Sequence, residues 1–236
     1  MTNLPDRLKK IVELVPDSET VADIGCDHAY VSIELVLQGK AKRALACDIN
    51  EGPLSSAKSN IINAGLKDKI ETRLSDGLNE VLPHEADTVV IAGMGGLLME
   101  KILQDRLHDF DTFILSPQSD IEHFRHFLID NRMIIRDEAM LMEDGKYYTV
   151  MTVISPDSSR EKEKSAEDFN KNEQDFYKNE EDFIYGGILL RKKDETLHNF
   201  LLKEKKRYES ILQKTQNESI KEAHKHCLKA LEGYLC

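Results

Sequence analysis

Short apolar runs and longer segments of helical spacing alternate along the chain from residue 20 to about residue 154. The apolar runs predict β-strands because they are brief, rich in β-branched residues and bounded by turn residues. They read, in chain order, "TVADIG", "RALACDI", "KIETRLS", "DTVVIAG" and "DTFILS". Apolar residues recur at helical spacing in other segments, which predicts helices at 29–39, 53–65, 95–105 and 120–131.

This alternation predicts a mostly parallel sheet with both faces covered, because a strand, a helix and the next strand together make a right-handed crossover. Two more strands are expected at about 133–142 and 146–154, joined by the turn-forming "EDGK", so the sheet ends with an antiparallel strand at or near its edge. A nicotinamide-binding Rossmann domain usually has six parallel strands. The predicted fold is therefore α/β, a Rossmann-like seven-stranded sheet of the class I methyltransferase type.

A different composition begins at Pro156. The residues after it are densely charged and contain a seven-residue echo, "EDFNKNE", "QDFYKNE" and "EDF". On a helix this period places Phe169, Phe176 and Phe183 on one stripe. A solvated linker helix with a thin apolar seam is one interpretation of the stripe, and a helix that docks on a partner is the other.

The end of the chain predicts two helices, 194–213 and 217–235, that form a helical hairpin or short coiled coil. "TQNES" between them is a turn, with Asn217 or Ser219 as the N-cap of the second helix. Three regions are expected: an α/β methyltransferase domain over 1–155, a charged linker over 156–185 and a helical domain over 186–236.

Composition narrows the class of protein. The 236 residues carry a formal charge of −11, which argues against a uniformly basic coat for nucleic acid. No segment has the roughly 20 apolar residues of a membrane span, and the first residues lack the apolar stretch of a signal peptide, so we expect a cytoplasmic protein. The cysteines lack C-x-x-C spacing, which predicts thiols and neither a metal site nor a disulfide framework. They are Cys26, Cys47, Cys227 and Cys236.

The turn after the first strand, "VADIGCDHAY", has the form of a nucleotide-binding turn. A dinucleotide site needs G-x-G-x-x-G so that the backbone can approach a pyrophosphate, and Gly25 stands alone here. Asp23 and Asp27 flank this glycine, and their carboxylates would repel a pyrophosphate. S-adenosylmethionine carries a sulfonium and an ammonium instead. The turn therefore favours this methyl donor, with His28 also placed at its site.

Further carboxylates follow the next two strands. Asp48 in "LACDIN", with Ile49 after it, lies where ribose hydroxyls are bound, and Asp76 in "LSDGL", before Gly77, is placed to accept from the adenine amino group. For each aspartate alone, a helix N-cap or a turn is the alternative role. Acidic residues at the ends of three successive strands nevertheless predict a cofactor site at the carboxyl edge of the sheet.

The fourth strand ends in "IAGMGG", residues 91–96. Its glycines let the main chain turn sharply and approach a flat substrate, and backbone carbonyls there can accept from an exocyclic amine. A phosphate loop is excluded because no G-K-[ST] follows. We place Ala92 in the cofactor site and Gly93 and Met94 in the catalytic site, with a purely structural glycine turn as the alternative.

Taken in order, "ADIGCDHAY", "EGPLSSAK", "SDGL", "IAGMGG" and "EDGKYY" resemble the TrmK family, bacterial tRNA adenine-N1 methyltransferases that modify position 22. The resemblance spans the whole chain and implies methyl transfer from S-adenosylmethionine to N1 of an adenine in tRNA. Tyr30, just past the cofactor turn, is the candidate for stacking on the base, and His28 is the candidate for shaping the cofactor pocket or orienting the base. A capping or core role is the alternative for each, and the resemblance favours the functional one. Two departures concern substrate contacts: "LSPQSD", with Gln118, where the family tends to have "QPN", and Thr149 in place of a glutamate.

A local excess of basic residues lies in the C-terminal helices. Residues 191–229 contain eleven lysines and arginines against six aspartates and glutamates, a net charge of +5 within a chain of −11. This excess predicts phosphate contacts to tRNA, and the alternative is a basic surface that binds no RNA. The oligomeric state stays open, with a monomer expected.

Two other classes of function stay open from the sequence. A small-molecule methyltransferase of the same fold would keep Asp23, Asp48 and Asp76 but would have no use for basic helices. An interaction module would bind a protein through its phenylalanine stripe and C-terminal helices, and would have no affinity for S-adenosylmethionine.

Overall fold

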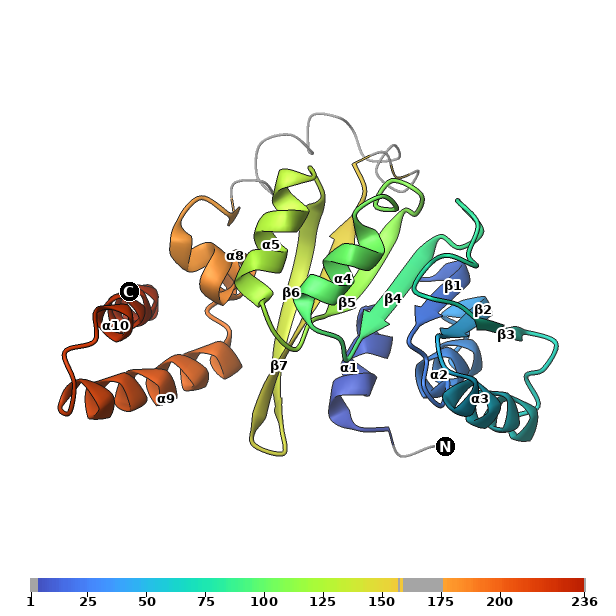
Figure 1. The fold of residues 1–236 in the computed structure, drawn as a ribbon, viewed down its shortest axis with the longest axis horizontal. Coiled ribbons are helices and arrows are strands. Elements are labelled where there is room, and N and C mark those ends of the chain that lie inside the picture. Colours follow the sequence, from blue (N-terminus) through green and yellow to red (C-terminus); the bar gives the residue numbers. More distant parts are fainter. Residues whose placement is uncertain (1–3, 157, 159–175, 236) are drawn as a thin grey trace.

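The computed structural model describes residues 4–156, 158 and 176–235, which fold around a seven-stranded sheet of order β3-β2-β1-β4-β5-β7-β6 (Figure 1). The strands are β1 (Ser18–Ile24), β2 (Ala41–Asp48), β3 (Ile70–Leu74), β4 (Thr88–Ala92), β5 (Thr112–Ser116), β6 (Ile134–Glu143) and β7 (Lys146–Ile154). This is the predicted class I methyltransferase sheet, and each predicted strand is present.

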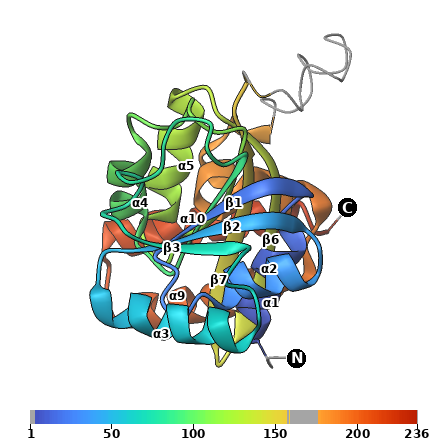
Figure 2. The same cartoon turned by 90° about the vertical axis from the view of Figure 1, so that its right-hand side faces the viewer.

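Helices cover both faces of the sheet (Figure 2). One face carries α1 (Asp6–Leu14), α2 (Tyr30–Leu37) and α3 (Glu51–Asn63), and the other carries α4 (Gly96–Leu103) and α5 (Ile121–Asp130). Successive residues of a strand point to opposite faces, so Val89 and Ile91 join the core under α4 and α5 while Val90 joins the core under α1 to α3. Burial on both sides explains why the strands are continuous apolar runs.

The terminal hairpin inserts one strand into the sheet. β7 lies between β5 and β6 and is antiparallel to both, so the antiparallel strand is next to the edge, as the sequence predicts. Asp144 and Gly145 both have positive φ, +49° and +76°, at the turn between the strands. Two such residues match the right-handed twist of the strands that they join.

Helix α1 has no counterpart among the predicted elements. Ile11 and Val12 are buried under the sheet, while most of its other side chains reach solvent. A helix of nine residues is only marginally stable by itself. α1 is stabilised by packing its narrow apolar stripe on the sheet, a contact that the sequence pattern does not predict.

Beyond residue 176 the chain is helical and lies past the β6 edge of the sheet (Figure 1). A π-helical turn, η2 (Asp182–Gly186), leads into α8 (Gly187–Lys192), α9 (Glu195–Leu212) and α10 (Glu218–Glu232). α9 and α10 pack together around a small core of their own, which confirms the predicted helical pair. The side chain of Asn217 accepts a hydrogen bond from the backbone N–H of Ile220, so Asn217 is the N-cap of α10. No helix in these described ranges is long and apolar enough to span a bilayer.

The predicted phenylalanine stripe does not form within the described residues. Phe169 lies outside them, and the chain between Phe176 and Phe183 is not a continuous helix. Both described rings pack against the core under α4 and α5. Phe183 also stacks on the ring of His126 with 3.7 Å between centroids. The positions of these two rings are therefore set by tertiary contacts with the sheet domain. They are not set by the seven-residue period of a helix.

A buried ion pair joins the C-terminal segment to the sheet domain. The Arg125 guanidinium on α5 donates to the Glu138 carboxylate on β6 at 2.9 Å, and the two side chains are 1% and 0% exposed. Arg125 also donates to the backbone carbonyls of Phe183 and Ile184, at 2.7 and 3.1 Å. Gly186 passes over the pair with φ +99°, and a Cβ there would lie 2.6 Å from the Glu138 carboxylate.

Candidate active site

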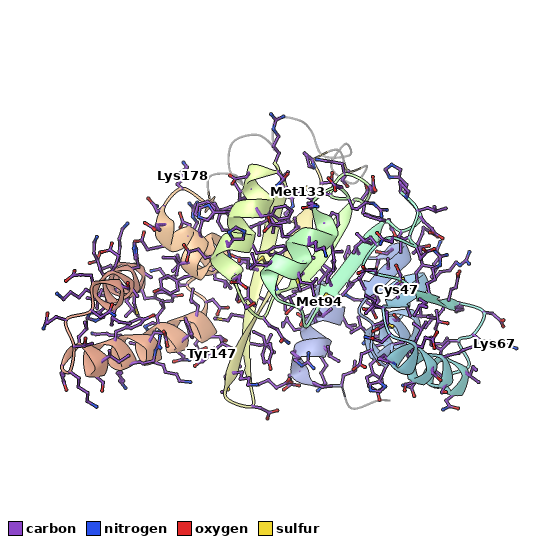
Figure 3. The ribbon with its side chains drawn as sticks, viewed as in Figure 1. Cys47, Lys67, Met94, Met133, Tyr147 and Lys178 are labelled. Atoms are coloured by element: carbon purple, nitrogen blue, oxygen red, sulfur yellow. The ribbon has the colours of Figure 1, made fainter. Side chains whose placement is uncertain are left out.

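The ends of the parallel strands lie level with one another at the carboxyl edge of the sheet. Ile24 of β1 pairs with both Cys47 of β2 and Ile91 of β4, and Figure 3 shows Cys47 and Met94 near this edge. The loops that leave these ends are 25–29, 49–50, 75–80, 93–95 and 117–120. All the residues placed in the cofactor and catalytic sites from sequence lie in these loops or in the strand and helix residues next to them.

Asp23 is buried inside β1, one residue before the strand ends. Its carboxylate accepts a hydrogen bond from the Ser32 hydroxyl on α2 at 2.7 Å. Burial raises the pKa of Asp23 from 3.8 to about 6, against the lowering effect of the Ser32 hydrogen bonds, and the nearby Asp48 carboxylate raises it further. None of the described residues offers this buried carboxylate a cationic side chain, so a bound cation would stabilise it.

The turn after β1 is held in an unusual backbone conformation. Gly25, Asp27 and Ala29 all have positive φ, between +50° and +74°, although two of them are not glycine. The backbone N–H groups of Gly25 and Cys26 both donate to the Cys47 carbonyl, which ties the turn to β2. Non-glycine residues in this region cost roughly 1–3 kcal/mol each and gather at functional sites.

Gly25 also lies under the Met94 side chain from the loop after β4. A Cβ on Gly25 would stand 2.4 Å from the Met94 methyl carbon. The two loops that the sequence assigns to the cofactor and catalytic sites are therefore in direct contact.

Asp48 ends β2 and organises the neighbouring loops. One carboxylate oxygen accepts from the Asp27 backbone N–H at 3.2 Å, and the other accepts from the Asn50 backbone N–H at 2.9 Å. The carboxylate is thus fixed in orientation by two backbone donors. Each oxygen keeps a lone pair, so a diol can still be bound by both.

Asp76 follows β3, and its side chain is exposed at the same edge. The turn that carries it is fixed by Ser75, whose hydroxyl donates to the Gly77 carbonyl and accepts from the Glu80 N–H. The Ser75 N–H in turn donates to the Asp48 carbonyl at 2.8 Å. Asp76 is therefore not a helix N-cap but does open a turn, in which the Asn79 N–H donates to its carbonyl, and its exposed carboxylate stays the candidate for the adenine amino group.

The loop after β4 is closely joined to the loop after β5. Gly93 has φ +81°, its N–H donates to the Ser116 carbonyl, and the Gln118 N–H donates to the Met94 carbonyl at 2.9 Å. A Cβ on Gly96 would lie 2.8 and 2.9 Å from backbone oxygens of the second loop. Small residues are therefore required here for packing between the two loops, which is the structural alternative for "IAGMGG", and the approach of a flat substrate stays a prediction.

His28 and Tyr30 lie on the outer side of the β1 turn. Their rings are 5.5 Å apart at 36°, and Tyr30, the first residue of α2, is 37% exposed. The Asn60 side chain on α3 donates to the His28 carbonyl at 3.0 Å, which fixes the backbone between the two rings. The turn that follows the buried Asp23 thus carries an exposed aromatic surface.

Several residues that shape the site were not predicted. Ser32 is a hydroxyl on the buried face of α2, Asn60 donates to a backbone carbonyl in the turn after β1, and Ser75 bonds backbone groups of its own turn. A serine in the apolar run "YVSIELVL" was the available signal for Ser32, since a buried hydroxyl needs a partner.

Three cysteines are free thiols and buried, as predicted, and Cys236 lies outside the described residues. Burial raises the pKa of Cys26 and also that of Cys47, to about 12, so both stay protonated at neutral pH beside the site. Among residues 4–156 and 176–235, no group of three or more His, Cys, Asp or Glu side chains has the arrangement of a metal site.

The chain matches a family model described as "Methyltransferase domain" over residues 4–151, which include all the loops above. It is 40% identical over 157 residues to the tRNA (adenine(22)-N(1))-methyltransferase of Bacillus subtilis. That alignment covers 65% of this chain and 66% of the relative, so the chain spans about two thirds of its length.

Solved structures cover the C-terminal helices as well. The crystal structure of the B. subtilis m1A22 tRNA methyltransferase TrmK has a TM-score of 0.77 and 30% identity, over 99% of this chain and 97% of that one. M. capricolum TrmK, in complex with S-adenosyl-homocysteine, has a TM-score of 0.81 and 26% identity over 98% of both chains. A Streptococcus pneumoniae protein in complex with S-adenosyl-L-methionine has a TM-score of 0.80 and 29% identity, over 97% of this chain and 99% of that one.

Proposed function

Because this chain belongs to the TrmK family of methyltransferases, we propose that it transfers the methyl group of S-adenosylmethionine to N1 of adenine 22 in tRNA. The observation that carries the proposal is the placement of Asp23, Asp48 and Asp76 at one edge of the sheet, each with carboxylate capacity left for a ligand. Relatives of the same fold bind S-adenosylmethionine or its product.

The donor set fits this cofactor. Asp23 has no cationic partner among residues 4–156 and 176–235, so a ligand ammonium or sulfonium would stabilise its ionised form. Asp48 is oriented for a ribose diol, with Ile49 exposed beside it, and Asp76 with Gly77 is placed for the adenine amino group and ring. When bound, S-adenosylmethionine supplies an electrophilic methyl group on a positively charged sulfur.

The reaction needs positioning more than proton transfer. N1 of adenine has a lone pair in the plane of the ring, so it attacks the methyl carbon without losing a proton first. The protein must hold donor sulfur, methyl carbon and N1 in line, which is the orientation effect. The loops after β1 and β4, in contact through Gly25 and Met94, bring the cofactor turn and the glycine-rich substrate loop together for this purpose.

Tyr30 and His28 are assigned to the target base. Base pairing or stacking hides N1, so the adenine must leave its stack and be received by an aromatic surface. The exposed Tyr30 ring next to His28 is such a surface.

Tyr30→Ala is expected to lower kcat/KM for tRNA by roughly 5- to 100-fold, the range for loss of one base-stacking partner. The dissociation constant of S-adenosylmethionine should stay within about twofold, because the ring is on the outer side of the turn. Tyr30→Phe keeps the stacking surface and should keep most activity. Steady-state kinetics and calorimetric titration measure the two quantities, and equal loss in Tyr30→Phe would contradict a stacking role.

The direct test of function is methyl transfer from labelled S-adenosylmethionine to tRNA, followed by separation of the nucleosides. We expect label in 1-methyladenosine with a transcript that has adenine at position 22, and none with a matched transcript that has guanine there. Cofactor binding without transfer to any tRNA would instead favour the small-molecule methyltransferase.

We also propose that α9 and α10 hold tRNA by its phosphates. Acidic neighbours pair with several of the basic residues, among them Arg207 with Glu204 and Lys221 with Glu218. Lys206 and Lys214 have no acidic partner in the described parts of the chain, and Lys203 lies over the Tyr147 ring at 5.3 Å. Figure 3 shows Tyr147 between the terminal hairpin and α9, so these cations extend from the sheet domain along the helix.

The double substitution Lys206→Glu with Lys214→Glu is expected to raise the Kd for tRNA roughly tenfold and to reduce the salt dependence of binding by about one ion per lost phosphate contact. The matched control is Lys67→Glu with Lys69→Glu, the same change of charge on exposed lysines; Lys67 lies at the opposite end of the molecule (Figure 3). Equal weakening in both pairs, measured by filter binding at several salt concentrations, would show a general charge effect and contradict a helical RNA site.

A further inference from the structure

We propose that Gln118 reads the target adenine through the ring edge that carries the N6 amino group and N7, and that it thereby selects adenine over guanine. The inference rests on the proposed function and names a specificity-determining residue for it. Gln118 lies two residues past β5, at the end of the strand that pairs with β4. It belongs to "LSPQSD", the segment that departs from the family pattern.

The backbone fixes Gln118 beside the substrate loop. Its N–H donates to the Met94 carbonyl at 2.9 Å, and the residue before it, Pro117, is buried and rigid. The side-chain amide nitrogen would lie 3.8 Å from a Cβ built on Gly93, an ordinary contact distance. Since Gly93 has no side chain, the amide lies beside the bare backbone of the glycine-rich loop.

The side-chain amide of Gln118 has free hydrogen-bonding capacity both as a donor and as an acceptor. Its side chain is exposed and makes no hydrogen bond to another described residue. Among the backbone carbonyls of the loop after β4, that of Met94 accepts from Gln118, and that of Gly95 accepts from both Leu98 and Met99. The neighbouring Ser119 hydroxyl donates to Asp120. Among the groups named here, the Gln118 side chain is therefore the one that can both accept and donate a hydrogen bond to a ligand.

Glutamine and adenine are complementary along this edge. The amide oxygen accepts from the N6 amino group while the amide nitrogen donates to N7, the pairing by which glutamine recognises adenine in nucleic acids. Guanine presents an acceptor, O6, where adenine has the amino group, and so leaves the amide oxygen without a donor. N7 lies on the far side of the ring from N1, so this contact leaves N1 free to meet the methyl group.

The contact also strengthens as the reaction proceeds. Methylation of N1 places positive charge on the adenine ring, and this charge spreads to the N6 amino group and makes it a better donor. A hydrogen bond to the amide oxygen is therefore stronger in the transition state than in the bound substrate. Loss of the amide should consequently lower kcat as well as raise KM.

The test uses the full-length protein and two tRNA transcripts, one with adenine and one with 7-deazaadenine at position 22. 7-Deazaadenine lacks only the N7 acceptor. We expect it to lower kcat/KM of the wild type about tenfold, and we expect Gln118→Ala to lower it about 10- to 100-fold on adenine but to show little further loss on 7-deazaadenine. Gln104→Ala, an exposed glutamine at the far end of α4, is the matched control and should behave as wild type.

Gln118→Glu gives the sharpest outcome. A carboxylate still accepts from N6 but repels the N7 lone pair, so this variant should prefer 7-deazaadenine over adenine, the reverse of the wild type. Two results would overturn the inference while wild-type activity on adenine 22 is intact. One is unchanged kinetics in Gln118→Ala. The other is the same loss of kcat/KM on 7-deazaadenine in the wild type, Gln118→Ala, Gln118→Glu and Gln104→Ala. A wild type that does not methylate N1 of adenine would instead refute the proposed function itself.

Discussion

Asp23→Asn is expected to weaken binding of S-adenosylmethionine severely and, at the same time, to stabilise the cofactor-free protein at neutral pH. Burial raises the pKa of Asp23 from 3.8 to about 6, so the ionised carboxylate is held at neutral pH at a free-energy cost of roughly 3 kcal/mol. Asparagine has the same shape and keeps an acceptor for the Ser32 hydroxyl, but it carries no charge. The variant therefore loses both the cost of burying the charge and the attraction for a cation.

The pH dependence of the wild type should have opposite signs for stability and for cofactor binding. The folded state holds the Asp23 proton more tightly than the unfolded state, so this group stabilises the fold fully below about pH 4 and loses that contribution as pH rises through about 6. A cationic ligand binds the ionised form. Affinity for S-adenosylmethionine should accordingly rise with pH, by close to tenfold per unit below pH 6, and level off above it.

Calorimetric titration between pH 5 and 8 measures the affinity, and urea unfolding of the cofactor-free protein measures the stability. We expect Asp23→Asn to weaken the cofactor by about 100-fold or more, the scale for removal of one member of a buried charge pair. Asp68→Asn removes an exposed carboxylate before β3 and serves as the control for net charge. Retained affinity in Asp23→Asn, or affinity that does not change between pH 5 and 7, would exclude Asp23 as the cation site.

The fold was predictable because its main elements follow local rules. Strands buried on both faces read as apolar runs, and the topology of crossovers brings their carboxyl ends together. Asp23, Asp48 and Asp76 could be placed at one edge for this reason alone, without any knowledge of their contacts. The order of elements thus determines which side chains meet.

The partners of these residues could not be predicted in the same way. Ser32 bonds Asp23 because α2 packs on β1, and the Asp27 backbone N–H bonds Asp48 from a turn in which Asp27 has positive φ. The heptad echo failed for a related reason: Phe176 and Phe183 are placed by the sheet domain, which outweighs the local period. Contacts between distant segments carry no periodic signal in one sequence.

The buried pair of Arg125 and Glu138 is the clearest example, since it joins α5, β6 and the C-terminal segment. Arg125→Met is expected to lower the free energy of unfolding by about 3–5 kcal/mol, because it leaves the Glu138 carboxylate buried without its cation. The double variant with Glu138→Met removes that charge as well. The double variant should recover a large part of the lost free energy of unfolding. The part that is not recovered reflects the carbonyls of residues 183 and 184, which lose Arg125 as their donor.

Urea unfolding of the two single variants and the double variant gives the coupling energy, and limited proteolysis reports whether the C-terminal helices detach first. Lys42→Met, which breaks the exposed pair of Lys42 with Glu19, is the control and should cost at most about 1 kcal/mol. If Arg125→Met were as mild as Lys42→Met, the pair would not be what fastens the C-terminal segment. A large coupling together with early cleavage after residue 176 would show that this pair fastens the C-terminal segment to α5 and β6.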